Sequence, residues 1–203
     1  SIVAGIRAGR KIYTNLRRAL NYLFAIHVPI AGLAILPVLF GWPSMLFPVH
    51  IVFLEMIIDP TCTLIFEAEP EDKDLMSRPP VPLDRPVFKR SEIIRAVLDG
   101  GFILVTLLLT YILGAWAGFE ENKLRTINFA VLVFSNLALI LAQRDYSFEI
   151  DLRRYFSSAN KILNVISVAA VLLLATSIYL PIFQKVFRFQ SISFLEFVAC
   201  AFL

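Results

Sequence analysis

The chain has 203 residues, of which 58% are hydrophobic and 17% are charged, and its mean hydropathy is +0.75. A water-soluble domain of this length cannot bury so much apolar surface, so the composition excludes a soluble domain and predicts an integral membrane protein. We interpret the net charge of +3 as an orientation signal, not as a nucleic-acid-binding surface. The two cysteines, Cys62 and Cys200, lie in apolar runs without metal-ligand or redox spacing, and we expect both to be packing residues.

Five apolar runs are long enough, or nearly so, to cross about 30 Å of hydrocarbon. A sixth run, 191–203, is too short to cross, and we expect it to be part of a further span. The predicted fold is all-α: a polytopic transmembrane helical bundle with five full spans plus a partial sixth. Because the chain starts within a helical pattern and stops within an apolar run, we expect a fragment of a larger membrane protein. The five full runs are 19–40, 45–66, 96–119, 126–142 and 162–183.

Lysine and arginine are concentrated at one end of these predicted spans. Segments 1–18, 67–95 and 143–161 hold fifteen of the 19 basic residues, and the loops on the other side hold four. The positive-inside rule therefore places these three segments in the cytoplasm and the turn at 41–44 outside. Residues 1–18 could be an interfacial amphipathic helix. The absence of a helix breaker before Pro29 favours a cytoplasmic stalk that continues into the first span.

The chain divides into four segments. The stalk, 1–18, leads to a helical hairpin over 19–66, and a cytoplasmic loop over 67–95 leads to a C-terminal helix bundle over 96–203 that we expect to be truncated at its end. Five prolines stiffen the loop into extended or turn conformations. A solvated linker and a polyproline ligand remain alternatives to a fixed surface that meets a soluble domain.

The hairpin carries two acids in the middle of its second apolar run. Glu55 and Asp59 are four residues apart, which places both on one face of a helix, and Pro60 follows at once. Each acid costs roughly 2.5–3.5 kcal/mol at the centre of a bilayer. We expect Pro60 to open the helix and free carbonyl oxygens, so that carboxylates and carbonyls form a cation site. We also expect the empty site to hold a proton that a bound cation expels, which predicts proton counter-transport.

Three sequence elements occur in a fixed order: Gly9-Arg10-x-Ile12-Tyr13-x-Asn15, then the apolar run with Asp59, then Asp74-Leu75-Met76-x-Arg78-Pro79-Pro80 with Pro86 behind it. In order and spacing they resemble the C-terminal membrane half of P-type cation ATPases of the calcium-, sodium- and proton-pump group. The resemblance is strong over 5–90 and topological over 91–203. It implies that the spans correspond to the fifth to tenth helices of such a pump.

The same resemblance implies cation ligands. On the second span, Glu55 and Asp59 stand where calcium pumps carry an asparagine and an aspartate, and on the first span His27 stands where they carry an asparagine. Isoleucine replaces two further ligands, which implies one ion site, completed by helices outside this chain. His27 is either a satisfied core residue or a ligand, proton carrier or countercharge. Ser135 and Asn136 stand where the family sometimes has an additional ligand, and interhelical hydrogen bonding is the alternative.

Coupling residues are implied in the same way. The stalk residues Arg10 and Tyr13 and the loop residues Arg78, Pro79 and Pro80 would transmit motion from cytoplasmic domains. Those domains of the same polypeptide, for phosphorylation, nucleotide binding and actuation, would hold the phosphorylated aspartate and the Mg-ATP site. Neither an Asp-Lys-Thr-Gly motif nor a glycine-rich phosphate loop occurs in this sequence, so these residues alone are not expected to hydrolyse ATP.

For two other polar residues in the spans, we expect a structural role rather than ion binding. We expect Asp99 to be a helix-end or packing residue, and His50 to pack at the membrane boundary, with a role in an ion exit path as its alternative.

The predicted function is therefore that of the C-terminal transmembrane domain of an ATP-driven cation pump. A divalent cation, calcium or manganese, is the first candidate cargo, and the proton is the second. A gradient-driven secondary transporter and a non-transporting scaffold remain alternatives, although no lysine or arginine lies within the five runs to pair with the acids. The expected partners are the lipid membrane and the other domains of the polypeptide, with no nucleic acid. We expect the protein to cross a cell membrane several times, and we expect this membrane to be a bacterial plasma membrane.

Overall fold

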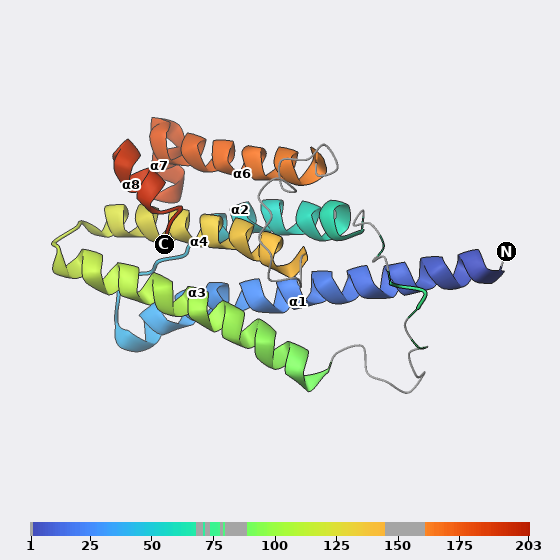
Figure 1. Ribbon diagram of the computed structural model, residues 1–203. Helices are drawn as coiled ribbons and strands as arrows, with labels where there is room; N and C mark the ends of the chain where they lie inside the picture. The colour runs from blue at the N-terminus through green and yellow to red at the C-terminus, as the bar shows by residue number, and fades with distance from the viewer. Residues whose placement is uncertain (1, 68–70, 72–73, 78, 80–88, 145–160) are drawn as a thin grey trace.

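The computed structural model describes residues 2–67, 71, 74–77, 79, 89–144 and 161–203. Within these ranges the chain forms helices and no strand, which confirms the all-α fold. Five segments are long and apolar enough to cross a membrane, and they run back and forth along the bundle (Figure 1). They are α1 (Ile2–Phe40), α2 (Pro48–Pro60) with its continuation η1 (Thr61–Phe66), α3 (Arg90–Trp116), α4 (Glu121–Arg144) and α6 (Lys161–Tyr179).

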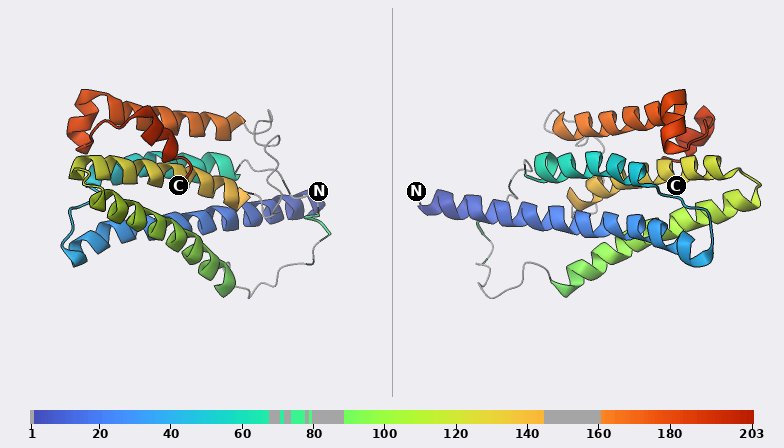
Figure 2. Two further views of the ribbon diagram at one scale, coloured as in Figure 1. Left: turned by 60° about the vertical axis from the view of Figure 1, so that its left-hand side comes forward. Right: turned by 180° about the vertical axis from the view of Figure 1, so that it is seen from behind.

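The stalk and the first span are one helix. α1 has 39 residues and is therefore about 58 Å long at 1.5 Å per residue. It accommodates both Pro29 and Pro37 without ending. Its N-terminal part projects beyond the neighbouring helices in each view (Figure 2). The stalk, rather than a separate interfacial helix, is what the structure contains.

The helix that carries Glu55 and Asp59 does not break at Pro60. α2 passes directly into the π-helix η1, whose wider turn accommodates a residue without a backbone N–H. The carbonyl oxygen of Ile57 accepts the backbone N–H of Thr61 and also its hydroxyl, at 2.7 Å. The predicted break at Pro60 is therefore absent, because the helix continues as a π-helical turn, while the carbonyl that Pro60 leaves without its α-helical donor is that of Met56, one residue before Ile57.

α3 and α4 both begin earlier than predicted. α3 starts at Arg90, where the carboxylate of Glu92 accepts the backbone N–H of Lys89 at 3.1 Å and caps the first turn. α4 starts at Glu121, so Lys123 and Arg125 belong to its first turns and not to a loop. The predicted run 126–142 itself holds no basic residue, but the helix extends beyond it and includes these two.

The C-terminal part of the chain is made of shorter helices. α6 ends at Tyr179, because Pro181 cannot continue its hydrogen-bond ladder, and Pro181 instead opens a separate helix, α7 (Pro181–Phe187). In the segment predicted as a partial sixth span, the structure has a helix of six residues, α8 (Phe194–Ala199). Its Phe197 ring contacts Phe134 of α4, with 5.5 Å between the ring centroids.

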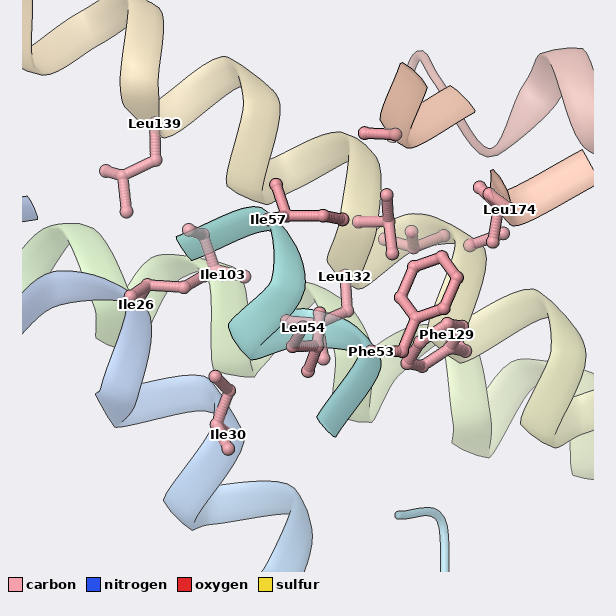
Figure 3. Packing of buried hydrophobic residues seen from close by; sticks show 14 of the residues in the cluster. Ile26, Ile30, Phe53, Leu54, Ile57, Ile103, Phe129, Leu132, Leu139 and Leu174 are labelled. Carbon is pink, nitrogen blue, oxygen red and sulfur yellow. The ribbon is translucent and has the colours of Figure 1, made fainter. Parts of the chain in front are cut away.

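α4 is the most enclosed span. In its most apolar stretch 72% of the residues are buried, against 28% in α3 and in α6. Figure 3 shows how its Phe129, Leu132 and Leu139 meet apolar side chains of α1, α2 and α3. Since lipid is as apolar as these side chains, the helices associate through close packing rather than through exclusion of water.

α1 and α3 approach each other closely at a glycine. A Cβ atom added to Gly100 would lie 2.2 Å from the carbonyl oxygen of Ala25 and 2.7 Å from the Cβ of Val28. Pro29 leaves this same carbonyl without its usual α-helical donor, since that donor would be the N–H of residue 29. Only glycine fits at this contact, and it fixes the spacing between α3 and the part of α1 that carries His27.

Candidate cation site

The structure brings His27 of α1 next to Glu55 of α2. Nε2 of His27 lies 3.8 Å from Oε1 of Glu55, and Nδ1 lies 2.8 Å from the carbonyl oxygen of Leu23. A carbonyl can only accept, so Nδ1 carries the hydrogen and Nε2 is the nitrogen that faces Glu55. A positive charge makes this contact favourable, whether it is a proton on Nε2 or a cation bound between the imidazole and the carboxylate.

All three predicted ligands face away from the described core. The side chains of His27 and Glu55 are 53% and 39% exposed, and Asp59, one helical turn beyond Glu55, is exposed as well. Among the described residues, no group of three or more His, Cys, Asp or Glu side chains is arranged to hold a metal ion. The chain therefore brings two of the three predicted ligands together and leaves Asp59 outside a three-ligand cluster.

Asn136, the further candidate, is fully buried in α4. Its Oδ1 accepts a hydrogen bond of 2.7 Å from the hydroxyl of Tyr22 in α1, and its Nδ2 has no hydrogen-bond partner in the part of the chain that the structure describes. This bond between helices is the alternative that the sequence left open, while the neighbouring Ser135 is half-buried. The sequence analysis missed Tyr22, although a hydroxyl within the apolar run 19–40 is a visible signal.

The stalk contacts the residues that follow η1. Nη1 of Arg10 donates to the carbonyl oxygen of Leu75 at 2.9 Å, and Nδ2 of Asn15 donates to the carbonyl oxygen of Glu67 at 3.4 Å. Glu67 follows η1 directly, so the stalk is hydrogen-bonded to the end of the helix that carries the acids.

A second stalk contact reaches α3. Arg17 forms an ion pair with Glu92 in the first turn of α3, and its guanidinium lies 5.7 Å from the ring centroid of Tyr13. The sequence analysis missed this ion pair. Of the predicted loop residues, Pro79 is exposed, and Arg78 and Pro80 lie outside the described residues.

At the opposite end of the bundle, His50 is a packing residue. Its Nδ1 accepts the backbone N–H of Phe47 at 2.8 Å, and its Nε2 donates to the carbonyl oxygen of Phe187 at 2.9 Å. The ring is fully buried and contacts the rings of Phe129 and Phe189, each at 5.0 Å between centroids. Both nitrogens are occupied, so no nitrogen of this ring is available to a passing ion.

Arg125 joins three segments at the same end. Its side chain is 1% exposed, and its guanidinium uses all five donors. Nε and Nη2 donate to the carbonyl oxygen of Ser44 at 3.2 and 3.1 Å, and Nη1 donates to the carbonyl oxygen of Arg188 at 3.1 Å. The remaining bonds go to Asn122, at 2.7 Å, and to Glu121. The Glu121-to-Arg125 spacing of four residues was a visible signal for this pair.

The polar group at the cytoplasmic end of α3 has a structural partner. Oδ2 of Asp99 accepts a hydrogen bond of 3.1 Å from Nε2 of Gln143 in α4. This bond between helices agrees with a packing role for Asp99. Asp99 therefore differs from Glu55, because its neighbour is the neutral amide of Gln143 and not an ionisable histidine.

Comparison with known proteins identifies the family. Residues 43–203 match the family described as "Cation transporting ATPase, C-terminus". The chain is 28% identical over 195 residues to the "Calcium-transporting ATPase" of Bacillus subtilis, which covers 95% of the chain and 22% of that relative. It is 29% identical over 153 residues to "Calcium-transporting ATPase 1" of Bacillus cereus, which covers 68% and 17%. It is 24% identical over 203 residues to "Calcium-transporting ATPase type 2C member 1" of Mus musculus, which covers 97% and 21%.

The match to the family covers most of the chain, whereas the chain spans only about a fifth of the length of these relatives. The membrane helices and the order of the sequence elements agree with this assignment. The resemblance drawn from the sequence is confirmed: the chain belongs to the P-type cation-transporting ATPases and is part of their C-terminal membrane region.

Proposed function

We propose that this chain forms part of the membrane pathway of an ATP-driven cation pump, with His27, Glu55 and Asp59 as its ligands for the transported ion. The contact between His27 and Glu55 carries the proposal. An imidazole nitrogen and a carboxylate oxygen, both of them cation ligands, lie 3.8 Å apart on membrane-spanning helices. A bound cation supplies the missing positive charge, and a proton supplies it when the cation has left.

The exposure of these side chains supports a site shared with other helices. A carboxylate that faces lipid costs roughly 2.5–3.5 kcal/mol, so Glu55 and Asp59 require cover from protein or water. Calcium takes six to eight oxygen ligands, more than two carboxylates provide. We infer that helices of the pump outside this chain cover the site and supply the remaining oxygens.

A divalent cation is the first candidate for the cargo. The relatives named above are calcium-transporting ATPases, and carboxylates are ligands that calcium prefers. The imidazole of His27 suits manganese better than calcium. A proton is the second candidate, because His27 and Glu55 can share one without further ligands. Membership in the ATPase family favours an ATP-driven pump over a gradient-driven transporter, and the two Bacillus relatives favour a bacterial plasma membrane.

The stalk contacts support a route for coupling. We propose that cytoplasmic domains act on the stalk and that Arg10 and Asn15 pass its movement to the loop and to the end of η1. Tyr13 and Arg17 would pass the same movement to α3 through Glu92. These domains would also supply Mg-ATP binding and the phosphorylated aspartate.

The test is the ATPase activity of the full-length protein in lipid, titrated with calcium, manganese, magnesium, sodium and potassium between pH 5 and 8. Parent, Asp59→Asn and Asp99→Asn proteins are compared. Asp99→Asn is the matched control, because it removes an intramembrane charge but keeps an oxygen for Gln143. We expect one metal to stimulate the parent and the control, and the stimulation to disappear in Asp59→Asn.

Other outcomes change the conclusion in defined ways. Activity that needs only magnesium, depends on pH and is lost in Asp59→Asn identifies a proton pump. Metal stimulation that survives in Asp59→Asn contradicts the proposed site. A folded parent without ATPase activity contradicts the pump and favours the gradient-driven transporter.

A further inference from the structure

A polar pocket opens at the end of the bundle that the positive-inside rule places outside. It has a volume of about 520 Å³ and lies between the first turn of α4 and the segment formed by α7 and the residues after it. Nothing in the cation pathway proposed above uses this pocket. Its lining residues are Glu121, Asn122, Arg125, Gln184, Lys185, Arg188 and Phe189.

The pocket carries two uncompensated positive charges. Glu121 and Arg125 neutralise each other in their ion pair, and the five donors of Arg125 are already used by the protein. Within the described ranges, no ion pair joins Lys185 or Arg188 to an acidic side chain. The pocket therefore favours an anion over a cation or a neutral ligand.

Arg188 is held in place by contacts within the protein, before any ligand binds. The residue ends α7 in the left-handed conformation, with φ at 52°, and its carbonyl oxygen accepts a hydrogen bond from Arg125. Its guanidinium lies 4.8 Å from the ring centroid of Phe47. A guanidinium that is already oriented loses little conformational freedom when it binds an oxyanion.

The surroundings of the pocket place it at the surface of the bilayer. α7 follows the membrane-spanning helix α6 directly, and three of its apolar side chains are exposed: Ile182, Phe183 and Val186. α7 also carries Lys185 in its last turn, with Arg188 directly after it, and exposed apolar residues next to basic ones are typical of the membrane interface. Basic groups at this depth lie level with lipid headgroups, while the apolar residues reach the acyl chains.

We propose that this pocket binds the phosphate group of an anionic phospholipid. Lys185 and Arg188 contact the phosphate, and Asn122 and Gln184 supply further polar contacts around the headgroup. Ile182 and Val186 lie against the acyl chains. The bound lipid links the start of α4 to α7, and so stabilises the end of the bundle at which α2 also begins.

Native mass spectrometry of the full-length protein tests this proposal. The protein, purified in neutral detergent, is titrated with phosphatidylglycerol and with phosphatidylcholine. Lys185→Gln/Arg188→Gln removes both free charges of the pocket, and Lys89→Gln/Lys161→Gln removes two exposed charges at the opposite end. We expect phosphatidylglycerol to bind the first double variant about 30-fold more weakly than the parent, since each basic residue contributes about fivefold. We expect no loss in the control.

The remaining outcomes overturn the proposal. Equal retention of phosphatidylglycerol by the parent and the pocket variant means that the lipid binds elsewhere. Equal binding of phosphatidylcholine and phosphatidylglycerol removes the preference for an anion. A third arm adds glycerol 3-phosphate at millimolar concentration, which we expect to leave the lipid bound. If it displaces the lipid completely, the pocket binds free phosphate compounds and the lipid assignment is wrong.

Discussion

Polar side chains around the α1–α2 turn and those midway along the same two helices have opposite environments. At the outer end, around the turn between the two helices, Arg125 satisfies all five of its donors and both nitrogens of His50 are occupied. At mid-membrane, Glu55 has His27 as its ionisable neighbour, at 3.8 Å, and both side chains are substantially exposed. The hydrogen bonds of Arg125 and His50 are complete within this chain, whereas the cation site is not.

This contrast separates polar residues that hold the fold from those available to a ligand. A buried arginine that is fully hydrogen-bonded has no N–H group left to bind a ligand, and its removal leaves several carbonyl groups without donors. The Glu55 carboxylate, substantially exposed beside His27, contributes little to folding and remains available to a cation or a proton. The contrast predicts that stability and transport respond to different substitutions.

The largest effect on stability is expected for Arg125→Met. This substitution leaves the carbonyl oxygens of Ser44 and Arg188 without their donors and Glu121 without its partner, which costs about 3–5 kcal/mol. Glu55→Gln is expected to change stability by less than about 1 kcal/mol, yet to abolish the cation response of the ATPase. The measurements are the thermal unfolding midpoint of the full-length protein in detergent and its ATPase activity.

Arg125→Lys gives the matched control for the first variant. Lysine keeps the charge but cannot reproduce the planar set of donors of the guanidinium. We therefore expect the stability of Arg125→Lys to lie between the stabilities of the parent and of Arg125→Met. If Glu55→Gln destabilised the protein as much as Arg125→Met does, the separation of the two regions would be wrong, and Glu55 would be a structural residue.

The sequence predicted the parts of this arrangement that depend on hydrophobic length and on residue type. Five apolar runs were sufficient to find the five spans, and two acids in one of them were sufficient to place a candidate site. The proximity of His27 to Glu55 was implied only through the family resemblance, because it depends on how α1 packs against α2. Apolar periodicity does not determine that packing.

The errors have local physical causes. Pro60 was expected to open its helix, but a π-helical turn absorbs the missing donor, and sequence alone does not distinguish the two responses. Arg125 was assigned to a loop because it is charged, yet three of its five hydrogen bonds go to segments far away in the chain, at Ser44 and Arg188. A single sequence cannot reveal such compensation, so charged residues near the ends of spans are easily misplaced.

The second prediction concerns the packing behind the cation site. Gly100→Ala introduces a Cβ 2.2 Å from the carbonyl oxygen of Ala25, a backbone atom that cannot move away without shifting α1. We expect a cost of about 1–3 kcal/mol in the free energy of unfolding. Since Ala25 and His27 are on the same helix, we also expect a weaker cation response in the ATPase assay. Thermal unfolding in detergent and the cation titration measure the two effects.

Gly101→Ala is the internal control for this variant. No atom lies within 4 Å of a Cβ added at Gly101, and alanine is the better helix former by about 0.5–1 kcal/mol. We therefore expect Gly101→Ala to be neutral or stabilising and to leave the cation response unchanged. Equal stability of the two variants would show that the contact between α1 and α3 tolerates a methyl group.

The smallest effect is expected at Glu196, a second paired acid at the outer end. Its carboxylate lies 2.6 Å from Nζ of Lys123 and accepts the backbone N–H of Ser193 at 2.7 Å. The hydrogen bond from Lys123, followed by that from Ser193, lowers the pKa of Glu196 below its usual value of 4.5. An acid whose pKa is lower in the folded state stabilises the fold above its unfolded pKa, and it loses this contribution as the pH falls through the folded pKa.

Glu196→Gln should therefore lower the thermal unfolding midpoint slightly at neutral pH and have no such effect at a pH well below 4. The difference corresponds to about 0.5 kcal/mol, because the pair is partly exposed to solvent and to salt. Glu120→Gln, an exposed acid in the turn before α4, serves as the control and should change neither midpoint. Unlike Glu55, Glu196 already has its cation within the protein, so its substitution should leave the cation response of the ATPase intact. A Glu196→Gln protein that lost this response would show that the outer end takes part in transport and is not only structural.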